Sequence, residues 1–331
     1  MSSFEVAVLG NLRRNAPHRE SEPADAWGDL DSESTMLALA EALEKGGHKA
    51  YFVEGDMSLP AKLARLRPDI CFNVSEGLYG DSREAHIPAV LEMMGIPYSG
   101  SDPQTLAITL DKPLTKQLAK DAGIPTPPWL LIRSQDVLRV LPDAAFPLPA
   151  FIKPAYEGSS KGIRLTSRAD AAGKARSTAK SLLKNYNQPV LIERYIDGDE
   201  VTVGIVGNSP PHIVGIMRVI PKKKFRTFVY SLEVKRDWRN LVEYECPAGL
   251  SKGAIKRITE ASLDAYKVLG CRDFSRVDFR VGTDGKPYFL EVNPLPGLNP
   301  VSGDLPIMSY KMGWTYGGLI KAVVEAALAR Y

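Results

Sequence analysis

Apolar positions in the first hundred residues alternate between two spacings. Short runs rich in β-branched and aromatic residues occur at residues 4–10, 49–55 and 68–74. Between the first two runs, residues 34–45 carry apolar side chains at helical spacing and are followed by a Gly-Gly pair, a common helix end. Strands that alternate with helices indicate a parallel α/β unit. The pattern therefore predicts such a unit at the start of the chain.

Residues 11–33 interrupt this alternation. They are polar and irregular, and they are rich in Pro, Asp and Glu. A stretch of this length without periodicity is usually either functional or disordered. The segment is therefore a candidate for a functional loop.

Helix-like and strand-like patterns continue through the rest of the chain. Asp111 is placed to cap a helix whose first turn holds Lys112 and Pro113. An Asp-Gly pair at residues 197–198 separates two strand-like runs. Further helices are predicted at residues 168–186, 251–270 and about 315–330.

The composition is that of an ordinary globular protein of 331 residues, long enough for two or three domains. A net charge of +3 is too small to indicate nucleic acid as a partner. No apolar run is long enough to span a bilayer, and the first residues lack the pattern of a secretion signal. The 3 cysteines match no zinc spacing, and their odd number argues against a disulfide framework. We therefore expect a reduced, cytoplasmic enzyme without a membrane or nucleic-acid partner.

The segment "SRVDFRVGTDGKPYFLEVNP" (residues 275–294) has the pattern of a β-hairpin. Two alternating runs flank an Asp-Gly pair, which is a strong two-residue turn signal. With that pair as the turn, Asp278 lies directly opposite Glu291, and Arg276 lies directly opposite Asn293. Period-two alternation places all four side chains on one face of the hairpin.

This face of the hairpin is a candidate cation site. Opposed residues have Cβ atoms about 4.5–5.5 Å apart, so two carboxylates there repel each other unless a cation lies between them. Oxygen ligands without sulfur or imidazole favour Mg²⁺ or Mn²⁺ over zinc. Asp278, Glu291 and Asn293 are therefore candidate metal ligands. The alternative is a polar outer face on which Arg276 pairs with the acids.

The segment "FIKPAYEGSSKGIRL" (residues 151–165) combines a strand-like start, Lys153 and a run rich in Gly and Ser, and a second strand-like stretch begins at Ile163. Small residues let the backbone approach a ligand and point N–H groups at it, and lysine supplies a charge for phosphate. Neither the G-x-x-x-x-G-K-[ST] order nor G-x-G-x-x-G is present. Together with Lys112 at a helix N-terminus and the acidic hairpin, this loop predicts a site for a magnesium nucleotide.

Five motifs in this order make the chain resemble an ATP-grasp ligase, and most of all the D-alanine–D-alanine ligase family, from about residue 65 onward. They are "GIPYSGSDPQTLAITLDKPLTK", "FIKPAYEGSSKGI", "LIERYIDGDEVTVGI", "SRVDFRV" and "FLEVNPLPGL". The resemblance implies an α/β chain with α+β elements and the ATP-grasp fold of three domains. These would be an N-terminal α/β domain at residues 1–105, a central ATP-binding lobe at residues 106–197 and a C-terminal lobe with the metal hairpin at residues 198–331.

The resemblance also implies catalytic roles. Arg276 would stabilise charge on the reacting acylphosphate, and Lys235 would approach the γ-phosphate from a second mobile loop. Ser159 belongs to the loop segment Gly158–Ser160, including Ser160, which would close over the transferring phosphate.

Further implied roles concern binding. ATP would be held by Lys112 and Lys153 at the phosphates, by Glu193, Arg194 and Ile196 at the adenine, and by Glu200 at the ribose. Asp278, Glu291 and Asn293 would hold two Mg²⁺ ions, or Mn²⁺. Gly297 and Ser302 would bind the carboxylate of the second substrate.

The implied reaction has two steps. A substrate carboxylate takes the γ-phosphoryl group of ATP, and an amine then attacks the acylphosphate while closed loops exclude water. The implied partners are small amino-acid or carboxylate substrates, and the implied assembly is a homodimer formed through the N-terminal region.

The chain departs from the family on the amino-acid side. Its first loop, "GNLRRNAPHRESEP", lacks the family's Gly-Gly motif and the glutamate that meets the substrate amine. In "SEGLYGDSRE", Glu76 stands where the family has His, at a strand end where ligands bind in parallel sheets. Arg236 stands where the family has Tyr, so two of the three members of the family's locking triad, which includes Ser159 here, are missing. We therefore expect a charged substrate pocket formed by Arg13, Arg14, Glu76, Arg83 and Arg236.

The sequence thus predicts an ATP-dependent carboxylate–amine ligase that forms an amide or dipeptide-like bond from an amino-acid substrate other than two D-alanines. Three alternatives stay open. One is a true D-alanine–D-alanine ligase with an unusual first loop, and another is a non-catalytic nucleotide-binding regulator. The third is an enzyme that uses the same acylphosphate for cyclisation or dehydration.

Overall fold

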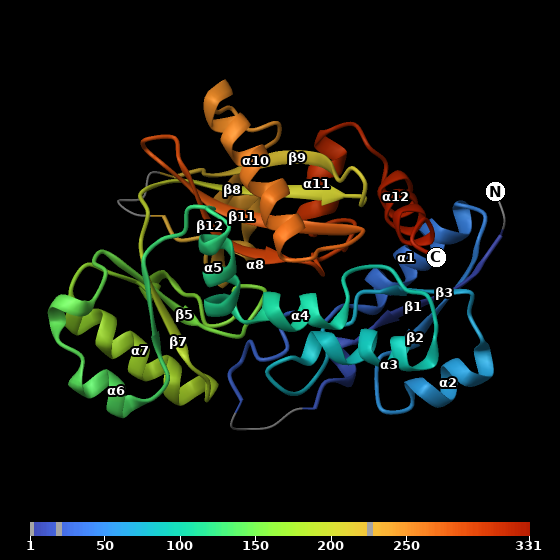
Figure 1. Ribbon diagram of the computed structural model, residues 1–331, viewed down its shortest axis with the longest axis horizontal. Helices are drawn as coiled ribbons and strands as arrows, with labels where there is room; N and C mark the ends of the chain where they lie inside the picture. Colours follow the sequence, from blue (N-terminus) through green and yellow to red (C-terminus); the bar gives the residue numbers. More distant parts are fainter. Residues whose placement is uncertain (1–2, 18–21, 224–227) are drawn as a thin grey trace.

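The N-terminal part of the chain forms a parallel sheet with helices on both faces (Figure 1). The computed structural model describes residues 3–17, 22–223 and 228–331. The strands run in the order β2-β1-β3 and all pair in parallel, so the predicted α/β unit is confirmed. Its elements are β1 (Glu5–Gly10), α1 (Glu33–Lys45), β2 (Lys49–Glu54), α2 (Leu59–Leu66), β3 (Ile70–Asn73) and α3 (His86–Met94), with short 3-10 turns at Arg13–Asn15 and Arg83–Ala85.

The middle of the chain forms a four-stranded antiparallel sheet in the order β4-β7-β5-β6. Two helices cover one face of it, and their apolar side chains form one buried core with the strands (Figure 1). The elements are β4 (Trp129–Ile132), α6 (Gln135–Val140), β5 (Ala150–Pro154), β6 (Arg168–Ala169), α7 (Ala172–Tyr186) and β7 (Val190–Arg194), with 3-10 turns at Asp143–Ala145 and Leu165–Ser167.

The C-terminal part forms a five-stranded antiparallel sheet in the order β10-β9-β8-β11-β12. Helix α10 packs on β11 and β12, and α11 packs on β9 (Figure 1). The elements are β8 (Gly198–Val206), β9 (His212–Pro221), α8 (Leu232–Arg236), α9 (Trp238–Leu241), β10 (Val242–Glu245), α10 (Lys252–Val268), β11 (Phe274–Gly282), β12 (Pro287–Asn293) and α11 (Asp304–Lys311).

The hydrophobic cores do not follow the order of the chain. Helix α5 (Lys112–Asp121), which comes after α4 (Pro103–Leu110), contributes Ala119 to the core under α10 and β11. The last helix, α12 (Tyr316–Leu328), packs against α1 and shares a core with the N-terminal sheet. The first and last helices of the chain therefore pack together, and α5 belongs to the core of the C-terminal sheet.

The β11–β12 hairpin has the predicted register where its charged residues lie, but a different turn. Asp278 pairs with Glu291, and Arg276 pairs with Asn293. The turn holds residues 283–285 and is closed by the amide of Gly282 donating to the carbonyl of Lys286 at 2.9 Å, so it has three residues instead of two. A bulge beyond Asp278 compensates for the extra turn residue and restores the predicted pairs.

The Gly-rich loop differs from its predicted form. The prediction that a strand begins at Ile163 is wrong, because β5 pairs with β6 only through Ala150–Ala169 and Phe151–Arg168. The amide of Gly162 donates instead to the Asp25 carboxylate at 3.0 Å. The loop is therefore held by a residue of the first loop and not by a neighbouring strand.

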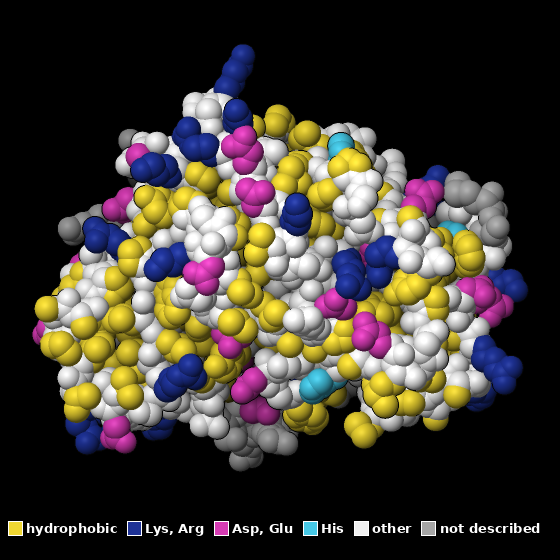
Figure 2. Space-filling view, in the orientation of Figure 1, with side chains coloured by type: hydrophobic (Ala, Val, Ile, Leu, Met, Phe, Trp, Pro, Cys, Tyr) yellow, Lys and Arg dark blue, Asp and Glu magenta, His cyan; other side chains and the backbone are white. Residues whose placement is uncertain are grey.

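Strands β7 and β8 belong to different sheets, and β8 begins at Gly198, the second residue of the Asp-Gly pair. The residues between them form the connection from the middle sheet to the C-terminal sheet (Figure 1). On the face drawn in Figure 2, basic and acidic side chains are interspersed. Among the described helices, none combines the length and apolarity needed to cross a membrane.

Candidate active site

Two adjoining cavities lie where the three sheets meet. The interlobe cavity is lined by the middle and C-terminal sheets, by residues 228–230 and by Lys235. The acidic cavity is lined by Asp29 and Asp31, by the segments that follow β3 and β12, and by the Gly-rich loop. Both cavities share Lys235, Arg276 and Glu291. A molecule in one cavity can therefore meet a molecule in the other at these three side chains.

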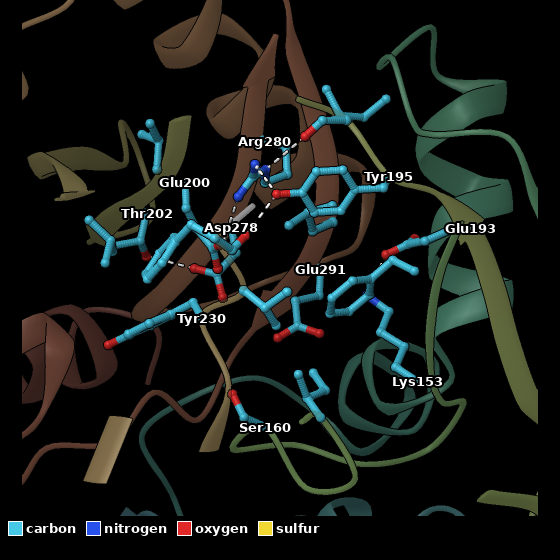
Figure 3. A pocket seen from close by; sticks show the side chains of 18 of the residues that line it. Lys153, Ser160, Glu193, Tyr195, Glu200, Thr202, Tyr230, Asp278, Arg280 and Glu291 are labelled. Atoms are coloured by element: carbon cyan, nitrogen blue, oxygen red, sulfur yellow. Dashed lines mark hydrogen bonds and ion pairs between the residues drawn. The ribbon is translucent and has the colours of Figure 1, made fainter. Parts of the chain in front are cut away.

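The interlobe cavity combines apolar walls with a charged end. Phe151, Ile196, Val219 and Tyr230 line it, together with Tyr195 from the connection between the sheets (Figure 3). Flat apolar walls of this kind suit an aromatic ring. The cavity can thus hold a planar base at one end and a charged group at the other.

At the charged end, two lysines share one buried carboxylate. Lys153 Nζ lies 3.0 Å from Glu193 Oε1, and Lys116 Nζ lies 2.8 Å from Glu193 Oε2. Burial raises the pKa of Glu193, but the two lysines lower it further, so the net direction is below its ordinary value. Burial lowers the pKa of Lys116 to about 8. Glu193 therefore positions Lys153 (Figure 3), and Lys116, one helical turn after Lys112 on α5, is a partner that sequence reasoning missed.

A second charged group lies on β8 and β11. Arg280 Nη1 lies 3.1 Å from Glu200 Oε2, and Arg280 Nη2 donates to the hydroxyl of Tyr195 at 2.9 Å (Figure 3). Burial raises the pKa of Glu200, and Arg280 lowers it only in part, so the net direction is upward. Arg280 was not predicted as a site residue. It alternates with Arg276 and Asp278 along the strand, so its place on the same face could have been predicted.

The hairpin carboxylates are held by neighbouring side chains. Arg276 donates to both oxygens of Asp278 at 2.9 and 2.8 Å, and Thr202 and Asn293 donate to the same carboxylate at 2.6 and 3.1 Å. Arg276 also lies 3.2 Å from Asp304. The face predicted from the hairpin register therefore exists, and Arg276 does pair with one of its acids.

Glu291 has a separate environment. Its Oε2 lies 3.5 Å from Lys112 Nζ, and Lys112 also donates to the carbonyl of Glu157. Burial raises the pKa of Glu291, but Lys112, Lys153, Arg276 and Lys235 lower it to about 2. Glu291 is therefore an ionised carboxylate, and it is the anion that Lys112 faces.

The donor set fits a hard divalent cation that is also bound by a ligand. Among the described residues, no three His, Cys, Asp or Glu side chains are grouped to hold a metal ion alone. Asp278, Glu291 and Asn293 offer two carboxylates and one amide, all oxygen donors. Mg²⁺ commonly takes one or two protein carboxylates and completes its shell with water and phosphate oxygens.

The Gly-rich loop is strained and presents free amides. Ser159 and Ser160 have φ values of +50° and +60°, which non-glycine residues rarely adopt. Their amides and that of Gly158 donate to no acceptor within the described chain. Strain of this kind is common where a loop binds a ligand, and three free consecutive amides suit an anion such as phosphate.

The first loop fastens the Gly-rich loop in place. Asp25, which is 1% exposed, accepts hydrogen bonds from the Gly162 amide at 3.0 Å, from Arg164 at 2.7 Å and from the Tyr186 hydroxyl at 2.7 Å. Asp29 Oδ2 lies 2.6 Å from Lys161 Nζ. We call these contacts of Asp25 and Asp29 the latch. Sequence reasoning missed them, although residues 22–31 were known to be rich in acids.

The second loop also contacts the Gly-rich loop. The amide of Leu232 donates to the carbonyl of Ile163 at 3.3 Å, and Arg164 lies 3.4 Å from Glu233. Residues 18–21 of the first loop and residues 224–227 of the second lie outside the described residues. Contacts other than the family's triad therefore join the loops over the site.

The acidic cavity is lined by four carboxylates from the N-terminal sheet. Glu76 follows β3, Glu84 belongs to the turn before α3, and Asp29 and Asp31 precede α1. Burial, together with other carboxylates nearby, raises the pKa of Glu76 well above its ordinary value. Burial raises the pKa of Asp31 and of Glu84 to about 7 in each case.

The predicted site residues are mostly brought together. Arg236 and Ser302 are the exceptions, because both are exposed and line neither cavity, and Ser302 bonds to Asn299. The interlobe cavity is lined by Lys153, Ser160, Glu193, Arg194, Ile196, Glu200, Lys235, Arg276, Asp278 and Glu291, and the acidic cavity by Glu76, Lys112, Gly158, Ser159, Lys235, Arg276, Glu291, Asn293 and Gly297.

The arginines expected around the substrate lie elsewhere. Arg13 donates to the carbonyl of Leu30 at 2.8 Å, and Arg14 pairs with Glu33 at the surface. Arg83 lies 3.1 Å from Asp29 and does not line the acidic cavity. None of the four expected arginines therefore lines the cavity with Glu76. Its charged lining consists of the acids Asp29, Asp31, Glu84 and Glu291 and of the basic residues Lys112, Lys235 and Arg276.

Comparisons with known proteins agree with this geometry. A family model described as "D-ala D-ala ligase C-terminus" matches residues 118–325. The chain is 35% identical to a D-alanine–D-alanine ligase of Aquifex aeolicus (strain VF5), over 88% of this chain and 93% of the relative. It is 30% identical to "Uncharacterized protein y4sG" of Sinorhizobium fredii (strain NBRC 101917 / NGR234), over 94% of this chain and 91% of the relative.

A solved structure is similar over almost the whole length. It is the D-alanine–D-alanine ligase of Bacillus anthracis complexed with ATP, with a TM-score of 0.72 and 23% identity, covering 99% of this chain and 98% of that one. At this identity the likeness shows the fold, which is ATP-grasp, as the motifs implied.

Proposed function

The chain belongs to the D-alanine–D-alanine ligase family of ATP-grasp enzymes, and on this premise we propose that it joins an amino-acid carboxylate to an amine through an acylphosphate, using substrates other than two D-alanines. Members of the family are ATP-dependent, ADP-forming ligases that make C–N bonds, so the alternative of a non-catalytic regulator is set aside. The observation that carries the proposal is the meeting of two cavities at Lys235, Arg276 and Glu291.

ATP would occupy the interlobe cavity. Its apolar walls suit adenine, and Glu200, whose side chain is 23% exposed, remains accessible for ribose hydroxyls. Lys153 and Lys112 would contact the phosphates from two sides, and the free amides at residues 158–160 would cover them. The burial of both lysines supports this, because a phosphate close to them would gain strongly from their charge.

Mg²⁺ would be held by Asp278, Glu291 and Asn293, and two ions, or Mn²⁺, are part of the proposal. A bound Mg²⁺ would neutralise charge on the phosphate oxygens. When the metal binds, Arg276 would give up only part of its bidentate contact with Asp278. It would stay in place because it also contacts Asp304.

The chemistry would take place where the cavities meet. A carboxylate oxygen of the first substrate would attack the γ-phosphorus, and ADP would leave. The amine of the second substrate would then attack the acyl carbon, lose a proton and release phosphate. Arg276 and Lys235 would stabilise the charge that develops on oxygen, and the joined loops would keep water from the acylphosphate.

The proposal is tested by phosphate release from Mg-ATP with D- and L-amino acids, offered singly and in pairs, with Asp278→Ala as the inactive control. We expect release with at least one amino acid or pair and little with D-alanine alone. Absence of release with every carboxylate and amine offered, from a protein that binds Mg-ATP, would overturn the proposal.

A genuine D-alanine–D-alanine ligase is the second candidate. The names of the relatives favour it, since those at 31–35% identity over about 90% of this chain carry that description. Growth rescue of a strain that lacks the enzyme separates the two candidates. Rescue, together with a D-alanyl-D-alanine product, would establish the second candidate and remove the first.

A homodimer formed through the N-terminal region is also part of the proposal. Met57 and Met93 are 99% and 88% exposed on that region. Light scattering after gel filtration tests it, and a monomer at micromolar concentration would contradict it.

A further inference from the structure

We propose that the first substrate carries a second cationic group beside its α-ammonium, and that Glu84, with Glu76 and Asp31, binds this group in the acidic cavity. The substrate class is therefore a basic amino acid with an amine or guanidine side chain. This inference rests on the proposed function, because it assigns the substrate of the same site.

Glu84 is the first observation. It is 8% exposed, lines the acidic cavity, and makes no hydrogen bond or ion pair with any residue that the structure describes. Burying a carboxylate without a partner is unfavourable, so such a group in a cleft points to a ligand that completes it.

Asp29 provides the contrast within the same cavity. It lies 2.6 Å from Lys161 and 3.1 Å from Arg83, so its charge is already compensated. Asp31 and Glu76 line the cavity as Glu84 does, and neither forms an ion pair with a described Lys, Arg or His. These three carboxyl groups thus lack the ion pairs that Asp29 has, and the α-ammonium of an ordinary amino acid supplies only one positive charge.

The arrangement of these acids favours an organic cation over a metal ion. They line one cavity, yet no three acidic, His or Cys side chains of residues 3–17, 22–223 and 228–331 converge as metal ligands do. An ammonium has three N–H donors and a guanidinium has five, directed outward from the cation. Such a group can meet carboxylates that surround it without converging on a single point.

The rest of the cavity sets the direction of the substrate. Lys235 and Arg276 lie at the end shared with the interlobe cavity, and they suit the reacting carboxylate. The acids come from the N-terminal sheet on the other side. A substrate with its carboxylate at one end and a cation at the other matches this polarity.

The test compares D- and L-lysine, ornithine and arginine with norleucine, glutamine and alanine. Two measurements are made on the full chain: phosphate release from Mg-ATP with alanine as the amine partner, and thermal stabilisation by each free amino acid. We expect the basic amino acids to be preferred in both. In Glu84→Gln, the preference in kcat/KM for basic over neutral substrates should fall by about 10- to 100-fold, the loss expected for a charged hydrogen bond.

Two controls make the result specific. Glu44→Gln, on an exposed position of α1, should keep the preference. Glu76→Gln should reduce the preference as Glu84→Gln does, and it replaces Glu84→Gln should that variant fail to fold.

The outcomes separate this inference from the proposed function. Phosphate release with neutral amino acids, together with no stabilisation by basic ones, would overturn the inference and leave the ligase proposal standing. Stabilisation by basic amino acids without phosphate release would support the binding site and overturn the ligase proposal. Neither signal would overturn both.

Discussion

The two cavities of this protein treat buried charge in opposite ways. In the interlobe cavity the carboxylates have partners: Glu193 pairs with two lysines, Glu200 pairs with Arg280, and Asp278 is bound by Arg276 at both oxygens. In the acidic cavity Asp29 is paired, but Glu76 and Glu84 have no hydrogen bond or ion pair within the described chain, and Asp31 has no ion pair. The first cavity is organised before a ligand arrives, whereas the second leaves carboxyl groups that a ligand can pair with.

This difference has a physical cause. A buried ion pair fixes the position of both side chains, and preorganised charges stabilise a reacting phosphate without rearranging. Burial favours the protonated form of a carboxyl group and raises the pKa of Glu84 to about 7, because the cations near it offset burial only in part. At Glu291 the cations Lys112, Lys153, Arg276 and Lys235 outweigh burial and lower the pKa to about 2. Catalysis by charge is therefore expected in the first cavity, and selection of the substrate by charge in the second.

The largest effect on activity is expected from a substitution in the interlobe cavity, where the charges are paired. Lys153→Ala removes a phosphate-facing charge and leaves Glu193 with Lys116 alone. We expect kcat/KM for ATP to fall by about 10²–10³-fold, as for other charge-stabilising groups. Steady-state phosphate release measures this, with Lys120→Ala, exposed on the same helix as Lys112, as the control. A loss no greater than that of the control would mean that Lys153 does not face the phosphates.

The carboxyl groups of the acidic cavity should make the stability of the protein depend on pH. The pKa of Glu84 is about 7 in the folded chain, against 4.5 as its ordinary value. Between these values the folded state binds the additional proton, so the free energy of unfolding decreases as pH rises from about 4.5 to 7 and then levels off. Burial also raises the pKa of the Asp31 carboxyl to about 7, so Asp31 acts in the same direction.

Denaturant unfolding of the ligand-free protein at pH 5 and pH 8 measures this decrease. In Glu84→Gln, the decrease in the free energy of unfolding between pH 5 and pH 8 should be smaller by on the order of 2 kcal/mol. In Glu44→Gln, this decrease should be unchanged. Equal slopes in Glu84→Gln and the wild-type chain would show that Glu84 is compensated in solution.

A smaller effect is expected when the latch is removed, and it concerns how much phosphate is released for each amide formed. Asp25→Ala removes three hydrogen bonds to the Gly-rich loop and its helix α7. We expect the ratio of phosphate released to amide formed to rise by about 10-fold, because a loosened loop admits water to the acylphosphate. Asp136→Ala, whose side chain is 85% exposed, is the control. An unchanged ratio would show that the latch does not govern access of water.

The latch changes the free energy of unfolding with pH in the direction opposite to that of the acidic cavity. Burial raises the pKa of Asp25, but its hydrogen bonds and Arg164 lower it overall below the ordinary value of 3.8. The stability it contributes is therefore present above about pH 4 and is lost only as pH falls through the lowered folded pKa. The phosphate-to-amide ratio of the wild-type chain should stay constant between pH 6 and pH 8.

The smallest effect is expected at Arg236. Its side chain is exposed on α8 and lines neither cavity. Arg236→Ala should change kcat/KM for either substrate by less than about 2-fold, as surface substitutions usually do. Steady-state kinetics checks this, and a change of 10-fold or more would show that α8 rotates toward the substrate during turnover.

Local pattern determined much of the interlobe cavity. The Asp111 cap of α5, which places Lys112, was predicted, and Asp111 accepts from the Leu114 amide at 2.9 Å. The pairs of Asp278 and Arg276 in the hairpin were predicted as well, since a register depends on neighbours within about twenty residues. Even there, the turn length was wrong, and the correct pairs result from a compensating bulge.

Only the tertiary structure decided the acidic cavity and the latch. Lys161 and Asp29 are 132 residues apart, and Gly162 and Asp25 are 137 apart. No periodicity relates such positions, because their contact depends on how one sheet packs on another. For the same reason the sequence placed arginines around the substrate, whereas the folded chain turns them to Leu30, Glu33 and Asp29 and leaves carboxylates facing the cavity.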